Sequence, residues 1–106
     1  MARKEFQTLT EQMYYILLAL LRPHHGYEIM QVVSDLSGGR VEVGAGTLYA
    51  LLGRFEREGF IVQVESDGRR RVYRLTKEGR KLLEEEYNRL KLLVEQGAPY
   101  LEGGFE

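Results

Sequence analysis

Three adjacent arginines, Arg69, Arg70 and Arg71, follow an Asp67-Gly68 pair in the second half of the chain. An Asp-Gly pair between two apolar segments is a strong signal for the turn of a β-hairpin. Guanidinium groups crowded at one turn repel one another, and a polyanion would relieve that cost. Because the guanidinium fork also fits phosphate, the run predicts contact with a nucleic-acid backbone. The alternative is a solvated, charged surface.

A second candidate site is the start of a predicted helix over residues 45–58. Small residues there allow close approach to another backbone, and the free N–H groups of a helix start suit a phosphate. The small residues include Ala45 and Gly46. The apolar positions recur at helical spacing, so Thr47, Tyr49, Ala50 and Arg54 lie on or beside the opposite face. A hydroxyl, a phenol and a guanidinium on one face suit base edges and phosphates. The alternative is a helix cap with ordinary surface residues, in which Arg54 pairs with a nearby glutamate.

The sequence gives little evidence for catalysis or for a metal or cofactor site. The chain has no cysteine, which excludes a disulfide, a thiolate zinc site and a thiol nucleophile. His24 and His25 are adjacent and have no acidic or cysteine cluster around them, so we interpret them as a polar turn between helices. Ser34 or Ser37 lacks the motif of a nucleophile elbow, and the glycines at 44–46 lack the Lys-Ser/Thr pair of a P-loop. The sequence therefore predicts no enzyme activity, no metal and no cofactor.

The chain has the length of one small domain, and its charge is unevenly distributed along the sequence. The 106 residues are 43% hydrophobic and 29% charged, with a formal net charge of −1. Residues 38–74 carry seven arginines against five acidic residues, a net +2, whereas residues 75–106 carry five basic against seven acidic residues. A basic strip on a nearly neutral domain can still bind phosphates locally. No signal-peptide or membrane-spanning pattern is present, and we expect a cytoplasmic protein with no membrane contact.

The predicted elements follow the order of a winged helix-turn-helix protein. The first helix begins near Thr8, which has capping-box spacing to Glu11, and ends before Pro23. Further helices are expected over residues 27–36 and 45–58, with a short extended piece at 41–43 between them. Strands at 60–65 and 72–75 form the wing, and a last helix runs from Thr76 to about Gln96. The predicted fold class is mainly α with a small β-hairpin (α+β). It places a DNA-binding domain at residues 1–75 and a dimerisation helix with its tail at 76–106.

The first and last helices carry more apolar surface than one small domain can bury easily. The first helix has a second apolar stripe, and the last has alternating steps of four, three and four, typical of a coiled-coil seam. These features predict a homodimer whose contacts include Tyr14, Leu18, Leu21, Leu83, Tyr87, Leu90 and Val94. Core packing within one subunit is the alternative.

Several segments resemble the PadR-type transcriptional regulators, in the right order over about residues 9–81. The segments are His25-Gly26-Tyr27-Glu28-Ile29, Gly46-Thr47-Leu48-Tyr49, Leu52-x-Arg54-Phe55-Glu56-x-Glu58-Gly59-Phe60-Ile61 and Tyr73-Arg74-Leu75-Thr76-x-x-Gly79-Arg80. The chain departs from the family at Phe55 and Phe60, where leucine is usual. With one helix after the wing, it is similar to the short branch of the family.

The resemblance implies a bacterial or archaeal repressor that binds a palindromic operator in double-stranded DNA. It implies a homodimer joined by the first and last helices, and release of DNA by a small-molecule effector. Some short members bind flat aromatic drugs between tryptophans; this chain has no tryptophan, and Tyr14, Tyr15, Tyr87 or Tyr100 are the residues that could substitute. The alternative function is a winged-helix module for protein–protein contacts without operator binding, since the fold alone does not fix function.

Overall fold

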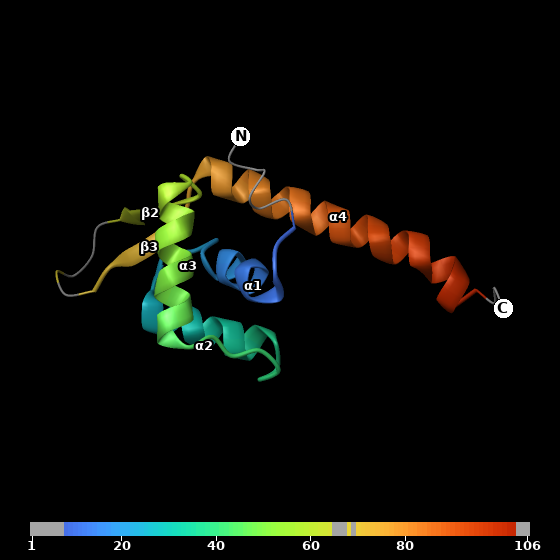
Figure 1. Cartoon of the computed structure of the whole chain (residues 1–106), viewed down its shortest axis with the longest axis horizontal. Helices are drawn as coiled ribbons and strands as arrows, with labels where there is room; N and C mark the ends of the chain where they lie inside the picture. Colours follow the sequence, from blue (N-terminus) through green and yellow to red (C-terminus); the bar gives the residue numbers. More distant parts are fainter. Residues whose placement is uncertain (1–7, 65–67, 69, 104–106) are drawn as a thin grey trace.

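The computed structural model describes residues 8–64, 68 and 70–103. It contains four helices and a three-stranded antiparallel sheet, and it measures 58 × 33 × 21 Å along its principal axes (Figure 1). This confirms the predicted α+β class. The elements in chain order are α1 (Glu11–Ala19), β1 (His24–His25), α2 (Gly26–Leu36), α3 (Ala45–Arg57), β2 (Ile61–Val64), β3 (Val72–Leu75) and α4 (Lys77–Leu101).

Helix α1 begins later than its capping motif predicted. Thr10, rather than Thr8, is the N-cap, and its hydroxyl accepts a hydrogen bond from the Met13 N–H at 3.2 Å. The predicted partner of Thr8, Glu11, is instead bound by Arg40 at 2.7 Å, and this hydrogen bond lowers the pKa of the Glu11 carboxyl. Thr10 is followed three positions later by Met13 rather than by a glutamate or glutamine, so its cap is a single hydrogen bond and not a capping box.

The two histidines form a strand, which corrects their interpretation as a turn between helices. In β1, His24 lies opposite Tyr73 and His25 opposite Val72 of β3, so that β3 becomes the central strand of the order β1-β3-β2. The predicted hairpin strands are present as β2 and β3, with Ile61 opposite Leu75. Residues 41–43 form no strand, although Val41 and Val43 are buried in the core.

The core lies where α1, α2 and α3 meet and where the sheet and the start of α4 close over them (Figure 1). The predicted apolar face of α3 is confirmed, because Leu48, Leu51, Leu52 and Phe55 are all buried. Burying side chains of this size contributes about 1.5–3 kcal/mol each before the entropy cost of folding. The buried face fixes which side of α3 faces solvent.

Helix α4 continues past the end predicted near Gln96 and includes Pro99 in its final turn. Because proline has no N–H, the hydrogen bond that residue 99 would otherwise donate to the carbonyl of Glu95 is missing from this turn. Its first turns pack on the domain, while its C-terminal half projects beyond it (Figure 1). Thr76 is the predicted N-cap, and its hydroxyl accepts from the Gly79 N–H at 3.0 Å.

A buried carboxylate fastens α4 to the segment before α1. Glu86 is 1% exposed and accepts a hydrogen bond from the Leu9 N–H at 3.2 Å. The guanidinium of Arg89 donates to both of its oxygens, at 2.9 and 2.8 Å. A buried charge is tolerated only when it is paired and hydrogen-bonded in this way. Glu86 therefore contributes to the direction in which α4 leaves the domain.

Two glycines of α4 make a matched test of this packing. A Cβ at Gly79 would overlap the carbonyl oxygen of Phe60, whereas a Cβ at Gly97 would meet nothing within 4 Å. We expect Gly79→Ala to lower the free energy of unfolding by about 1–3 kcal/mol, because the overlap involves backbone that cannot move aside. Gly97→Ala should raise it by about 0.5–1 kcal/mol, since alanine is the better helix former.

The measurement is urea denaturation followed by circular dichroism. A Gly79→Ala variant as stable as the wild type would contradict the close approach of α4 to Phe60.

Candidate DNA-binding surface

The face of α3 opposite the core is exposed, as the helical periodicity requires. Ala45, Gly46, Thr47 and Tyr49 are all exposed, and Tyr49 is 51% accessible. Gly44 is the N-cap and offers no side chain to the first turn, so the N–H groups there are not capped by it. Such a helix start is chemically suited to an anion. A hydroxyl and a phenol therefore project beside a favourable position for phosphate.

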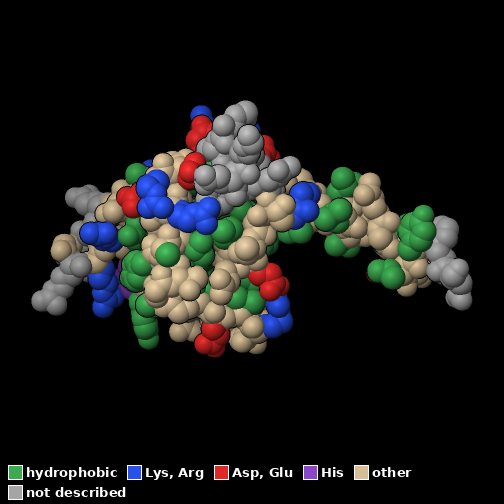
Figure 2. Space-filling view, in the orientation of Figure 1, with side chains coloured by type: hydrophobic (Ala, Val, Ile, Leu, Met, Phe, Trp, Pro, Cys, Tyr) green, Lys and Arg blue, Asp and Glu red, His purple; other side chains and the backbone are tan. Residues whose placement is uncertain are grey.

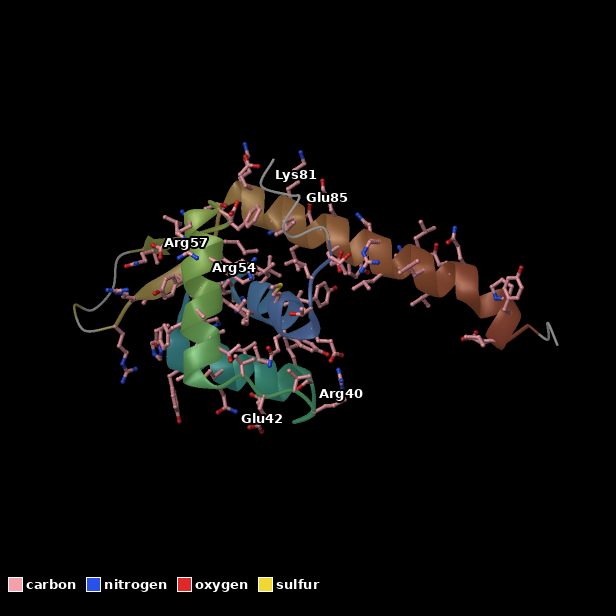
Figure 3. The ribbon with its side chains drawn as sticks, in the orientation of Figure 1. Arg40, Glu42, Arg54, Arg57, Lys81 and Glu85 are labelled. Carbon is pink, nitrogen blue, oxygen red and sulfur yellow. The ribbon has the colours of Figure 1, made fainter. Side chains whose placement is uncertain are left out.

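Arg54 lies apart from these residues, in the last turn of α3 together with Arg57 (Figure 3). Seven residues separate it from Thr47, which is about 10 Å along a helix. It is half-buried and engaged in a contact within the chain. Of the predicted α3 residues, Arg54 is therefore the one that the structure does not bring to the N-terminal end of the helix.

The wing arginines meet α3 across a cavity of about 470 Å³. The lining combines Tyr49 of α3, residues at the start of α2 and two arginines before β3: His25, Gly26, Tyr27, Tyr49, Arg70 and Arg71. Three predicted residues thus share one hollow. Arg69 lies outside the described residues, as does Asp67; Gly68 has φ +93°, the left-handed conformation that the predicted turn requires.

Gly26 is the residue that lets Tyr49 lie against the start of α2. A Cβ added at Gly26 would overlap the phenol oxygen of Tyr49. Gly26 is itself buried, and the phenol above it remains half exposed. The small residue at this position therefore sets the height at which the Tyr49 hydroxyl stands over the cavity.

His25 organises the start of α2 and also touches the wing. Its Nδ1 is positioned to accept from the Glu28 N–H at 3.4 Å, while the Glu28 carboxylate accepts from the His25 N–H at 3.0 Å. This is a reciprocal capping box. The hydrogen bond from the His25 backbone, followed by that from the His24 ring, lowers the pKa of the Glu28 carboxyl. The Nε2 of His25 lies 2.9 Å from a guanidinium nitrogen of Arg70.

Sequence reasoning missed His25, Gly26 and Tyr27 as parts of this surface. The pattern His25-x-x-Glu28 at the start of a predicted helix was an available sign of the capping box. The contact with Arg70 spans 45 positions and carries no local pattern. Only the pairing of β1 with β3 brings the two residues together.

The predicted dimer residues fall into three groups: buried, half-buried and exposed. Leu83 is 4% exposed and belongs to the core of its own chain, which removes it from the exposed seam. Tyr14 and Leu18 are half-buried against that core, and burial raises the pKa of the Tyr14 phenol. Leu90 is half-buried, while Leu21, Tyr87 and Val94 are 46%, 53% and 70% exposed. The seam that remains lies on the projecting part of α4, where hydrophobic side chains gather (Figure 2).

The helices and wing described above define a winged-helix protein. The sequence profile of the transcriptional regulator PadR-like family matches residues 16–85, which is most of the chain. The protein therefore belongs to the PadR-like family of transcriptional regulators. Members of this family are DNA-binding regulators and not enzymes, in agreement with the prediction from the sequence.

The chain is also similar to individual proteins. The transcriptional regulator Rv3488 of Mycobacterium tuberculosis is 35% identical over 96 residues, covering 88% of this chain and 87% of the relative. An uncharacterized 37.1 kDa protein in transposon TN4556 of Streptomyces fradiae is 42% identical over 64 residues, which are 60% of this chain but only 18% of that protein. The PadR family transcriptional regulator from Eggerthella lenta has a similar crystal structure, with a TM-score of 0.72, 27% identity and coverage of 87% of this chain and 82% of the other.

The described part of the chain has neither a metal-binding cluster nor a membrane-spanning helix. Residues 8–64, 68 and 70–103 hold no group of three or more histidines and carboxylates placed to bind a metal ion. Among the same residues, no helix combines the length and apolar character needed to cross a bilayer.

The contact between Gly26 and Tyr49 generates a double-mutant prediction. Gly26→Ala should displace the phenol and weaken binding of a duplex DNA by about 1 kcal/mol, the scale of one lost hydrogen bond. In a Tyr49→Ala background the same substitution should have no further effect, because the group it displaces is gone.

Fluorescence anisotropy with all four proteins measures the cycle, and circular dichroism checks their fold. If the two substitutions weaken binding additively, Gly26 does not act through Tyr49.

Proposed function

We propose that this protein is a repressor that binds a palindromic operator as a homodimer, with α3 in the major groove and the wing on the adjacent backbone. The observation that carries the proposal is the shared cavity of Tyr49, Arg70 and Arg71. Base edges are read in the major groove, which is wide enough for a helix, while phosphate contacts fix the register. Thr47 and Tyr49 would supply contacts at the groove, and Arg70 and Arg71 would supply charge at the backbone.

Dimerisation is supported by the exposed apolar surface of α4. Apolar side chains of this helix from Tyr87 onward are between 50% and 88% exposed: Tyr87, Leu92, Leu93, Val94, Tyr100 and Leu101. Of these, Tyr87, Val94 and Leu101 recur every seven residues and so lie on one face of the helix. Exposed apolar side chains gathered on one face of a small protein typically mark an interaction site. A two-fold axis through the paired helices would present two α3–wing surfaces to two half-sites about 34 Å apart. Residues 76–106 would then serve as the dimerisation unit.

A small cavity supports the proposal of a small-molecule effector. It has a volume of about 270 Å³ and lies between α1 and α4, with Tyr14, Tyr15, Glu86 and Leu90 in its lining. A ligand bound there would touch both helices proposed to form the dimer. It would therefore change the spacing of the two DNA-binding surfaces if it favoured one arrangement of these helices.

DNA binding through the wing arginines should weaken as the salt concentration rises, whereas a salt-insensitive interaction with a partner would favour the alternative of a protein-interaction module. Arg70→Ala with Arg71→Ala should weaken binding to operator and random DNA alike. Each lost phosphate contact should reduce the log–log salt slope by about 0.9. Arg80→Ala is the control, because Arg80 is an exposed arginine of α4 paired with Glu84 and lies outside the cavity.

Anisotropy titrations at several salt concentrations make this measurement. An unchanged affinity and slope in the double variant would remove the wing from the binding surface.

A charge placed on α4 tests the dimer. Val94→Asp should convert a dimer into a monomer, because an unpaired carboxylate in an apolar interface costs several kcal/mol. Operator affinity should then collapse, since the avidity of two linked half-sites is lost. Asn88→Asp is the matched control on an exposed position of the same helix and should leave the dimer intact.

Analytical sedimentation at micromolar concentration measures the oligomeric state of the wild type and of both variants. A monomeric wild type, or a Val94→Asp variant that remains dimeric, would rule out this seam.

A further inference from the structure

Arg57 lies on the exposed face of α3 and is not part of the cavity described above. At about 3.6 residues per turn, Gly46, Ala50, Gly53 and Arg57 fall on the side of α3 opposite its buried residues. The first three have at most a methyl group as a side chain. Arg57 is therefore the long side chain among the four, and a molecule lying along the centre of this face would meet it.

The guanidinium of Arg57 is turned back along α3, although the residue belongs to the last turn of the helix (Figure 3). Its Nη1 lies 3.4 Å from the position that a Cβ would occupy on Gly53, one turn earlier. Side chains of a helix lean toward its N-terminus, which accounts for this direction. Thr47 lies six residues before Gly53, or about 9 Å along the helix. Both ends of this face therefore fit within the width of a major groove, which is about 12 Å.

The hydrogen-bond donors of Arg57 are available to a molecule outside the chain. The residue is exposed, and its neighbour Glu56 accepts a hydrogen bond from the Gln63 amide at 3.0 Å. Among the residues that the structure describes, no hydrogen bond or ion pair engages the Arg57 guanidinium. Arginine presents its N–H donors in a planar fork, and two of them match the O6 and N7 acceptors of guanine.

Gly53 gives an independent reason to place DNA at this face. Glycine inside a helix is less favourable than alanine, so its presence normally reflects a need for space. Apart from the backbone of α3 itself, the described chain brings only the Arg57 guanidinium within 4 Å of a Cβ at this position. The fold therefore does not require glycine here, whereas close approach of the helix to a ligand would.

We propose that Arg57 is a further specificity-determining residue, whose guanidinium donates to a guanine in the major groove beside Gly53. Thr47 would contact the groove near the start of α3, and Arg57 would read a base pair farther along the same helix. The inference rests on the proposed function, because it requires α3 to lie in the major groove of an operator.

The first test selects duplexes from a random-sequence library with the full chain, and repeats the selection with Arg57→Ala. The wild type should enrich a guanine at one position of each half-site, and the variant should lose the preference at that position while keeping the others. Thr47→Ala should relax a different base pair. Arg80→Ala removes an exposed arginine of α4 and should leave every preference unchanged.

The second test measures affinity by fluorescence anisotropy, with the selected operator and a random-sequence duplex of the same length. Arg57→Ala should weaken operator binding by about fivefold or more, the scale of one bidentate contact to guanine, and should change binding to the random duplex far less. Circular dichroism checks that the variant is folded.

Gly53→Ala separates a role in DNA binding from a role in the fold. The added methyl group favours the helix, so the urea midpoint of unfolding should rise. It also stands where DNA approaches, so operator binding should weaken. A purely structural role would not move stability and affinity in opposite directions.

Three results would overturn the inference. They are selection of the wild-type sequence by Arg57→Ala, an equal loss of its affinity for operator and random DNA, which indicates a phosphate contact, and unchanged operator binding by Gly53→Ala. If the wild type enriches no sequence at all, the proposed function itself is contradicted, and this inference with it.

Discussion

The close approach of α4 to the end of α3 is the constraint on which the arrangement of this protein depends. At Gly79 the helix backbone leaves no room for a side chain beside the Phe60 carbonyl. Thr76 strengthens the same junction, because its N–H donates to the Phe60 oxygen at 3.0 Å and its hydroxyl to the Gly59 oxygen at 2.7 Å. One compact junction thus joins α3, the wing and α4.

The direction of α4 has consequences at both ends of the molecule. Near the domain, the buried Glu86 carboxylate and Arg89 keep the helix against the segment at Leu9. Farther along, the helix carries its apolar side chains out beyond the domain (Figure 2). If those side chains pair with a second copy, the junction at Gly79 sets the distance between two DNA-binding surfaces. Stability and operator geometry would then depend on the same contacts.

The sequence predicted what depends on local periodicity. The buried face of α3 follows from apolar residues at steps of three and four, and its exposed face with Thr47 and Tyr49 follows from the same pattern. The order of helices and wing was predictable because each element has its own caps, turn residues and apolar spacing. The segments that resemble the PadR-type regulators lie within these elements.

What the sequence did not predict depends on contacts between distant segments. A two-residue strand such as β1 is too short to show alternation, so His24 and His25 read as a turn. Glutamate is usually a surface residue, but Glu86 is buried and hydrogen-bonded by Leu9 and Arg89. Leu83 fits a coiled-coil seam by spacing, yet the domain covers it. In α1, Glu11, which capping-box spacing assigns to Thr8, is instead bound by Arg40, a residue from another segment.

In the proposed complex, α4 pairs two α3–wing surfaces on one face of DNA. Hydroxyl-radical footprinting on an operator selected from random DNA tests this arrangement, because it maps protected backbone at single-nucleotide resolution. The proposed dimer should give two equivalent protected half-sites, which are related by a two-fold axis and whose centres lie about 34 Å, or one helical turn, apart. A single protected site without symmetry would contradict it.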